Sequence, residues 1–158
     1  MATYTAVATV TGGRTGHATS VNPDAEFDIS APAQLGGTGE GVNPEQLFAV
    51  GWGACYQSAL MAAAKEKRVN AMTIMKSKVR VNVTLTHEET ADLSAKIEVF
   101  VPDMELDQVQ ELVDLANTIC PYSKATEGNI PTETVAVASL GEQAASRLPV
   151  EGADTFRP

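Results

Sequence analysis

Residues 43–68 read NPEQLFAVGWGACYQSALMAAAKEKR, and this stretch decides the fold. Asn43 suits a helix N-cap, Pro44 suits the first helical position, and Glu45 suits the positive end of the helix dipole. The basic residues that close the stretch suit the negative end. The sequence therefore predicts one long helix over residues 44–68.

This predicted helix is built mainly from small residues. Gly51 and Gly53 lie near its centre, and each costs roughly 1 kcal/mol of helix propensity relative to alanine. Close approach of another helix or of a sheet would offset that cost, because small side chains let two backbones come near each other. We therefore expect the helix to be largely buried. Cys55 lies at its centre, and from the residues alone a lone thiol there is best explained as a packed side chain.

Outward from this helix, the remaining segments give a mixed order of strands and helices. Turn signals and β-forming residues predict strands, alternating apolar residues predict a hairpin, and an apolar stripe predicts a second helix ending at Cys120-Pro121. The predicted strands cover 3–10, 17–21, 26–30, 79–85, 93–99 and 132–140, and the second helix covers 107–119. We predict one domain over 1–140, followed by a mobile or surface-draped tail over 141–158.

Composition excludes several classes of partner. The chain has 158 residues, of which 44% are hydrophobic, and its formal net charge is −9. A basic patch for nucleic acid or anionic lipid is not apparent. The N-terminus does not read as a signal peptide, and no apolar run approaches the length needed to span a bilayer. These features predict a cytoplasmic protein without nucleic-acid or membrane partners, in a compartment where two cysteines seldom form a lasting structural disulfide.

The sequence motifs offer little support for a metal site or a cofactor site. His17 and His87 are the only histidines, and neither has a cysteine or histidine at ligand spacing. The glycine-rich segment GGTGEG at residues 36–41 lacks the strand before it and the Lys-Ser/Thr after it that a phosphate loop requires. We expect no cofactor and no metal.

Three separated segments resemble a known family. They read TGGRTG at residues 11–16, NPEQLFAVGWGACYQSAL at 43–60 and CPYSKATEGNI at 120–130. In these segments the chain resembles the organic hydroperoxide resistance proteins, the Ohr branch of the Ohr/OsmC thiol peroxidases, and the resemblance extends over residues 3–140. It implies an α+β fold in which antiparallel sheets wrap around long central helices, an intertwined homodimer, and cofactor-free reduction of organic hydroperoxides.

The resemblance also implies a role for four side chains. Cys55 resembles the peroxidatic cysteine, Cys120 the resolving cysteine, Arg14 the guanidinium beside the thiolate, and Glu45 the carboxylate that orients the guanidinium. Chemistry agrees with the need for a cation, because an ordinary thiol with a pKa of about 8.5 is only about 3% ionised at pH 7. Taken without the resemblance, Arg14 is better explained as a solvated turn residue, and Glu45 is explained as a charge that complements the helix N-terminus.

Substrate and reductant follow from the same resemblance. Apolar residues around the first cysteine would suit an alkyl or fatty-acyl hydroperoxide; they are Phe48, Trp52, Tyr56 and Met61. The family implies re-reduction by a dithiol of the lipoyl type carried on a lipoylated protein. The alternative is a non-catalytic ligand-binding or stress-associated protein with a structural cysteine pair.

Helix geometry raises one further expectation. Ten residues of continuous helix separate Glu45 from Cys55 by roughly 15 Å along the axis, too far for one compact site. A break in the helix at Gly51 or Gly53 would solve this problem, and so would an antiparallel partner helix in the homodimer that the resemblance implies. We therefore expect at least one member of the Arg14 and Glu45 pair to act on the cysteine of the opposite subunit.

Overall fold

The computed structural model describes residues 1–87 and 90–141, and the chain forms two compact units. The first unit contains Met1–Leu47, and the second begins at Phe48. The single domain over 1–140 stays a prediction, and the predicted mobile tail falls outside the described residues, except for Gly141.

The first unit is a three-stranded antiparallel sheet in the order β1-β2-β3. Its elements are β1 (Val7–Thr11), the short 3-10 helix η1 (Gly13–Thr15), β2 (His17–Val21), β3 (Ala25–Asp28) and the 3-10 helix η2 (Ala33–Leu35). The three predicted strands are confirmed. The first of them begins at Val7 rather than at residue 3, because Val7 pairs with Val21, the last residue of its partner strand.

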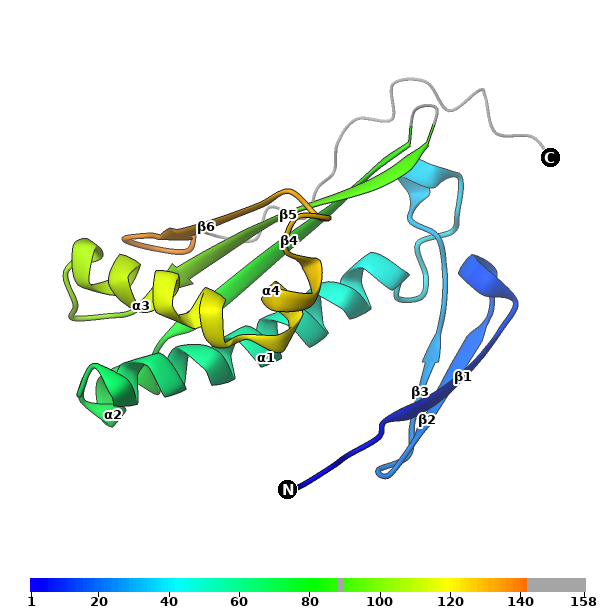
Figure 1. Ribbon diagram of the computed structural model, residues 1–158. Helices are drawn as coiled ribbons and strands as arrows, with labels where there is room; N and C mark the ends of the chain where they lie inside the picture. The colour runs from blue at the N-terminus through cyan, green and yellow to red at the C-terminus, as the bar shows by residue number, and fades with distance from the viewer. Residues whose placement is uncertain (88–89, 142–158) are drawn as a thin grey trace. The chain divides into compact units, whose positions relative to one another are not determined.

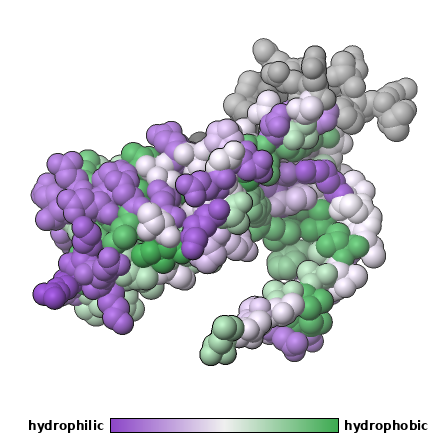
Figure 2. All heavy atoms as spheres, viewed as in Figure 1, coloured by the Kyte–Doolittle hydropathy of each residue, from purple (hydrophilic) through white to green (hydrophobic). Residues whose placement is uncertain are grey.

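The two outer strands of this sheet leave their residues open to solvent, whereas Ala18 of β2 is buried. Every residue of β1 and β3 is exposed, and the exposed apolar side chains include Val7, Val10, Val21 and Phe27. Figure 2 shows such apolar residues among the polar ones at the surface. An apolar surface of this kind is typical of a region that another chain covers.

The second unit holds the longest helix and a second sheet (Figure 1). Its elements are α1 (Pro44–Glu66), which starts in the last residues of the first unit, α2 (Ala71–Ile74), β4 (Lys78–His87), β5 (Ala91–Phe100), α3 (Leu106–Ile119), α4 (Pro121–Thr126) and β6 (Thr132–Ala136). The predicted long helix, hairpin, second helix and last strand are confirmed, while the short helix α2 was not predicted.

The second sheet departs from the expected antiparallel arrangement in one pair of strands. Strands β4 and β5 form the predicted antiparallel hairpin, but β6 runs parallel to β5. The connection between β5 and β6 explains their parallel direction. It contains α3 and α4, and such a helical crossover carries the chain back to the end of the sheet at which β5 began, so β6 runs in the same direction as β5.

The core of the second unit lies between this sheet and the helices, which cover one face of it (Figure 1). The alternating residues Ala95, Ile97 and Val99 of β5 are buried, as a strand with one covered face requires. They pack with a stripe of α1 and a stripe of α3. These stripes comprise Trp52, Tyr56, Ala59, Leu60, Ala63, Ala64, Val109, Leu112, Val113 and Ala116.

The small residues of α1 permit the close packing that the sequence predicts. A Cβ at Gly51 would lie 3.4 Å from the ring of Tyr122, and a Cβ at Gly53 would lie 3.5 Å from Val81. Burial is less complete than expected, because Val50 is 70% exposed on the same helix.

Helix α1 also corrects the expectation about apolar runs. Among the described residues it is the one helix long and apolar enough, by length and composition, to cross a membrane. The packing of its buried stripe against β5 and α3 accounts for this composition.

The buried hydroxyl of Tyr56 offers a test of this packing. It donates a 2.9 Å hydrogen bond to the carbonyl oxygen of Val113 and so joins α1 to α3. Tyr56→Phe should lower the free energy of unfolding by about 1 kcal/mol, because the carbonyl loses its buried donor. Tyr4→Phe is the matched control, since Tyr4 is 78% exposed, and urea denaturation of both variants checks the result. Equal stability of the two variants would contradict this packing.

Candidate active site

The two cysteines of the chain lie in contact with each other. Cys55 is at the centre of α1, and Cys120 is the single residue between α3 and α4. Their sulfur atoms are 3.5 Å apart, with the Cys120 thiol donating to the Cys55 sulfur, and both are free thiols. Cys120 is completely buried, whereas Cys55 is partly exposed. The predicted cysteine pair is thus brought together within one chain.

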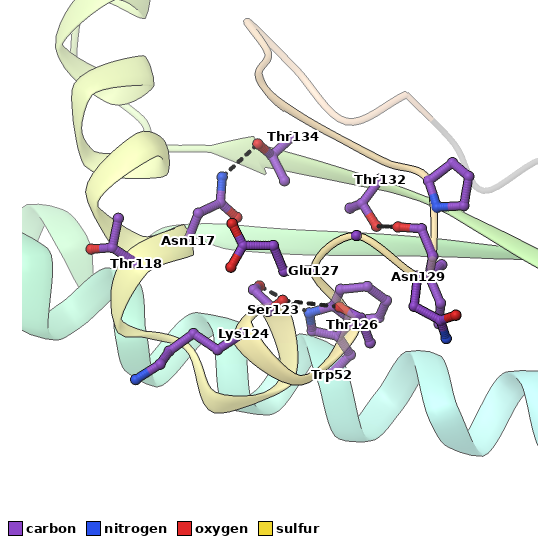
Figure 3. A pocket seen from close by; sticks show the side chains of 13 residues that line it. Trp52, Asn117, Thr118, Ser123, Lys124, Thr126, Glu127, Asn129, Thr132 and Thr134 are labelled. Atoms are coloured by element: carbon purple, nitrogen blue, oxygen red, sulfur yellow. Dashed lines mark hydrogen bonds between the residues drawn. The ribbon is translucent and has the colours of Figure 1, made fainter.

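Aromatic contacts bring α4 against α1 at this point. The ring of Tyr122 lies over Gly51, where a Cβ would just fit at 3.4 Å and a side chain larger than alanine would meet the ring. It also stacks with Phe48, with ring centroids 6.4 Å apart. The indole Nε1 of Trp52 donates a 3.2 Å hydrogen bond to the hydroxyl of Ser123 (Figure 3). Sequence reasoning proposed Phe48 and Trp52 as apolar surface, but did not foresee Tyr122 and Ser123 as their partners.

The surroundings of Cys55 do not ionise it. Burial raises the pKa of the Cys55 thiol above its ordinary value, and the adjacent Cys120 raises the pKa further. The backbone N–H of Tyr122 opposes these effects by donating to the sulfur. A thiolate nucleophile at neutral pH therefore needs a cation in addition to these groups.

The second pair of predicted residues also meets within one chain. Arg14 and Glu45 form a bidentate ion pair, with Nη1 to Oε2 at 2.9 Å and Nη2 to Oε1 at 2.6 Å. Two parallel N–H···O bonds fix the plane of the guanidinium and leave its other donors available. Both residues belong to the first unit, whereas both cysteines belong to the second.

Glycines shape the loop that presents Arg14. Gly12 has φ of 73° and Gly13 has φ of 58°, in the left-handed region that favours glycine. A Cβ on Gly16 would overlap the carbonyl oxygen of Thr11. The motif TGGRTG therefore folds into a tight turn whose middle residue is the arginine.

Glu45 is held by the start of α1. The predicted N-cap is confirmed, because the side chain of Asn43 accepts a 2.9 Å hydrogen bond from the backbone N–H of Gln46. The side chain of Gln46 in turn accepts from the N–H of Asn43 at 2.9 Å. This reciprocal arrangement is a capping box, which the spacing Asn-x-x-Gln would have indicated. It fixes the first turn and hence the position of Glu45.

The ion pair shifts the titration of both partners. The hydrogen bond from Arg14 holds the pKa of Glu45 below its ordinary value, and the same bond raises the pKa of Arg14. The Glu45 side chain is 15% exposed and that of Arg14 is 44% exposed. Both groups are therefore charged at neutral pH.

A family model described as OsmC-like protein matches residues 37–135. The chain is 39% identical over 133 residues to the organic hydroperoxide resistance protein OhrB of Bacillus subtilis, covering 82% of this chain and 95% of that one. The chain belongs to the OsmC-like family, in its organic hydroperoxide resistance branch.

Solved structures agree with this assignment. The crystal structure of OhrB of Bacillus subtilis is 38% identical with a TM-score of 0.73, covering 85% of this chain and 98% of that one. An organic hydroperoxide resistance protein from Elizabethkingia anophelis is 35% identical with a TM-score of 0.78, covering 87% and 99%. The matched OsmC-like segment contains Glu45, Cys55 and Cys120 and begins after the loop of Arg14.

The Arg14 and Glu45 pair should make the stability of the fold depend on pH. Because the folded pKa of Glu45 is depressed, the pair stabilises the fold above the unfolded pKa, and this contribution is lost as pH falls through the folded pKa. Arg14→Ala should return the Glu45 titration toward its ordinary range, measured by carboxyl NMR. Arg80→Ala, which removes a cation from β4, is the control and should leave this titration in place. If the pKa of Glu45 is the same in the Arg14→Ala variant as in the parent, the coupling is disproved.

Proposed function

We propose that the protein is a cysteine-based peroxidase that reduces organic hydroperoxides, of the alkyl or fatty-acyl type, to alcohols. The observation that carries this proposal is the pair of free thiols 3.5 Å apart, one of them completely buried, in a member of the organic hydroperoxide resistance branch. Two sulfurs at this separation need little movement to form a disulfide. We also propose that the protein acts in the cytoplasm, where its thiols start reduced.

In the first step Cys55 acts as the nucleophile. Its thiolate attacks one oxygen of the hydroperoxide, the O–O bond breaks, and the leaving alkoxide takes up a proton to become the alcohol. Cys55 is left as a sulfenic acid. In the second step the Cys120 sulfur attacks the sulfur of that sulfenic acid, the S–O bond breaks, and water leaves. The product is a disulfide between Cys55 and Cys120.

Arg14 supplies the cation that the first step requires in this proposal. Burial holds the pKa of Cys55 high, so a guanidinium near the sulfur would favour the thiolate and the developing negative charge on the peroxide oxygen. Glu45 orients that guanidinium through the bidentate contact. The remaining donors of Arg14 are free to hold the thiolate and the peroxide.

A dithiol completes the proposed cycle. One of its thiolates attacks the disulfide to give a mixed disulfide, and its second thiol displaces the protein sulfur, returning both cysteines to the thiol form. We propose a reductant of the lipoyl type, a dihydrolipoyl group on a lipoylated protein. No bound cofactor takes part in this scheme.

The function is tested with single-cysteine variants mixed with cumene hydroperoxide. The parent should lose two thiols per chain, with one alcohol formed for each disulfide. Cys55→Ser should lose peroxide reduction entirely, whereas Cys120→Ser should reduce one equivalent and then stall as a sulfenic acid or a higher oxide. Stopped-flow kinetics and mass spectrometry measure both outcomes. Unreacted thiols in the parent would favour the alternative, a binding protein with a structural cysteine pair.

We propose further that the protein is a homodimer whose sites are shared between subunits. The exposed apolar residues of the first sheet provide a surface for a second chain. Since α1 is continuous, Glu45 and Cys55 lie roughly 15 Å apart along it. Arg14 and Glu45 pair within one chain, so in this proposal both act together on Cys55 of the partner subunit.

Mixing inactive variants tests the shared site. After subunit exchange, Cys55→Ser chains mixed with Glu45→Ala chains should regain about a quarter of parental activity, because half of the dimers are mixed and each carries one intact site. Mixing Cys55→Ser with Cys120→Ser is the control and should regain no turnover, since both sulfurs of a site come from one chain. No recovery in the first mixture, after exchange is verified, would show that each site is built within one subunit.

A further inference from the structure

Cys120 lies at the corner between α3 and α4, and the helix that follows it is short. Cys120 has φ of −64° and ψ of 119°, so it breaks the helical path between the two helices. Helix α4 has only six residues and is followed by Glu127 with ψ of 129° and by Gly128 with φ of 73°. So short a helix has little stability of its own. The backbone N–H of Cys120 donates to the carbonyl oxygen of Ala116 at the end of α3, and the contacts that α4 makes hold the other side of this corner.

One side of α4 borders a cavity of about 710 Å³ (Figure 3). Residues that precede and follow Cys120 in the chain line this cavity, among them Asn117, Thr118, Ser123 and Lys124. A helix that borders open space is held by close packing only on its other sides. The contacts of α4 with α3 and with α1 therefore fix its orientation.

The hydrogen bond from Trp52 to Ser123 is placed to do this. Trp52 precedes Cys55 by three residues on α1, and Ser123 follows Cys120 by three residues at the start of α4. Trp52 and Cys55 share a face of α1, and Cys120 is the N-cap residue of the helix that carries Ser123, so the 3.2 Å bond and the 3.5 Å sulfur contact join the same two segments. The indole is completely buried and its N–H can only donate. Rotation of α4 would break this bond and would strain the position of Cys120, which directly precedes α4.

We propose that Ser123, held by Trp52, is a positioning residue for disulfide formation: its hydrogen bond keeps α4 oriented so that the Cys120 sulfur faces Cys55. This inference rests on the proposed function, because it concerns the step in which Cys120 resolves the sulfenic acid. That step needs the attacking sulfur within about 3.5 Å of its target and in line with the S–O bond that breaks. The proton lost from Cys120 and the departing hydroxide leave together as water.

Removing the Ser123 hydroxyl tests sulfenic acid formation and disulfide formation separately. Reduced protein is mixed with one equivalent of cumene hydroperoxide and quenched with dimedone over time, and intact mass reports the sulfenic acid and the disulfide. Ser123→Ala should form the sulfenic acid at the parental rate and convert it to the disulfide about two- to tenfold more slowly, the effect expected from loss of one neutral hydrogen bond. A general loss of structure would instead slow both steps.

Thr126→Ala is the matched control. Thr126 also lies on α4 and lines the same cavity, but its hydroxyl donates only within its own helix, to the carbonyl oxygens of Tyr122 and Ser123. This variant should resolve the sulfenic acid at the parental rate. Equal slowing in Thr126→Ala and Ser123→Ala would overturn the assignment to Ser123, since general loosening of α4 would then explain both.

A double-mutant cycle identifies the hydrogen bond itself. Trp52→Phe keeps an aromatic ring and removes the donor, so it should slow disulfide formation to a similar degree, and the double variant should be no slower than either single one. Additive slowing would overturn the proposal. The single tryptophan of the chain adds a second readout, because its fluorescence should change in reduced Ser123→Ala and not in Thr126→Ala.

The outcomes distinguish this inference from the proposed function. A parent protein whose thiols do not react with the hydroperoxide would defeat the proposed function. A parent that forms the disulfide, together with a Ser123→Ala variant that forms it equally fast, would leave the function standing and refute the positioning role. Slower resolution at an unchanged rate of sulfenic acid formation supports both.

Discussion

The contact between α1 and α4 is the constraint on which the thiol chemistry of this chain depends. It brings the sulfurs of Cys55 and Cys120 to 3.5 Å, and it places the ring of Tyr122 against Gly51, where only a small residue fits. The helix propensity given up at such a glycine is recovered in tertiary packing, which is the usual source of helix stability in proteins. The composition of α1 is thus explained by a requirement for proximity rather than for helix formation.

The contact between α1 and α4 also disfavours ionisation of the Cys55 thiol. Packing around Cys55 raises the pKa of its thiol, whereas a nucleophile must be ionised at neutral pH. The chain holds a complementary group in its first unit, where Glu45 fixes the guanidinium of Arg14 in one plane. The proposed mechanism requires this guanidinium and a Cys55 thiol to meet in one site, and the proposed dimer would also cover the exposed apolar residues of the first unit.

Local signals in the sequence predicted much of this structure, and the remainder depends on tertiary contacts. Asn43 and Pro44 marked the start of α1 correctly because capping is decided within one turn of helix. The expected close approach at Gly51 was right, but a single sequence does not say which side chain fills the space, so Tyr122 and its neighbour Ser123 were missed. The parallel pairing of β6 was missed for the same reason, since strand direction follows from how the intervening helices cross the sheet.

The unequal exposure of the two sulfurs has a consequence for the direction of electron flow. Cys120 is completely enclosed, while Cys55 is open in part to its surroundings. If a disulfide forms with this arrangement kept, an incoming thiol would meet the Cys55 sulfur first, and the Cys120 sulfur would be the one that departs. Cys55 would then react with both the oxidant and the reductant in turn. Cys120 would react only with Cys55, inside the protein.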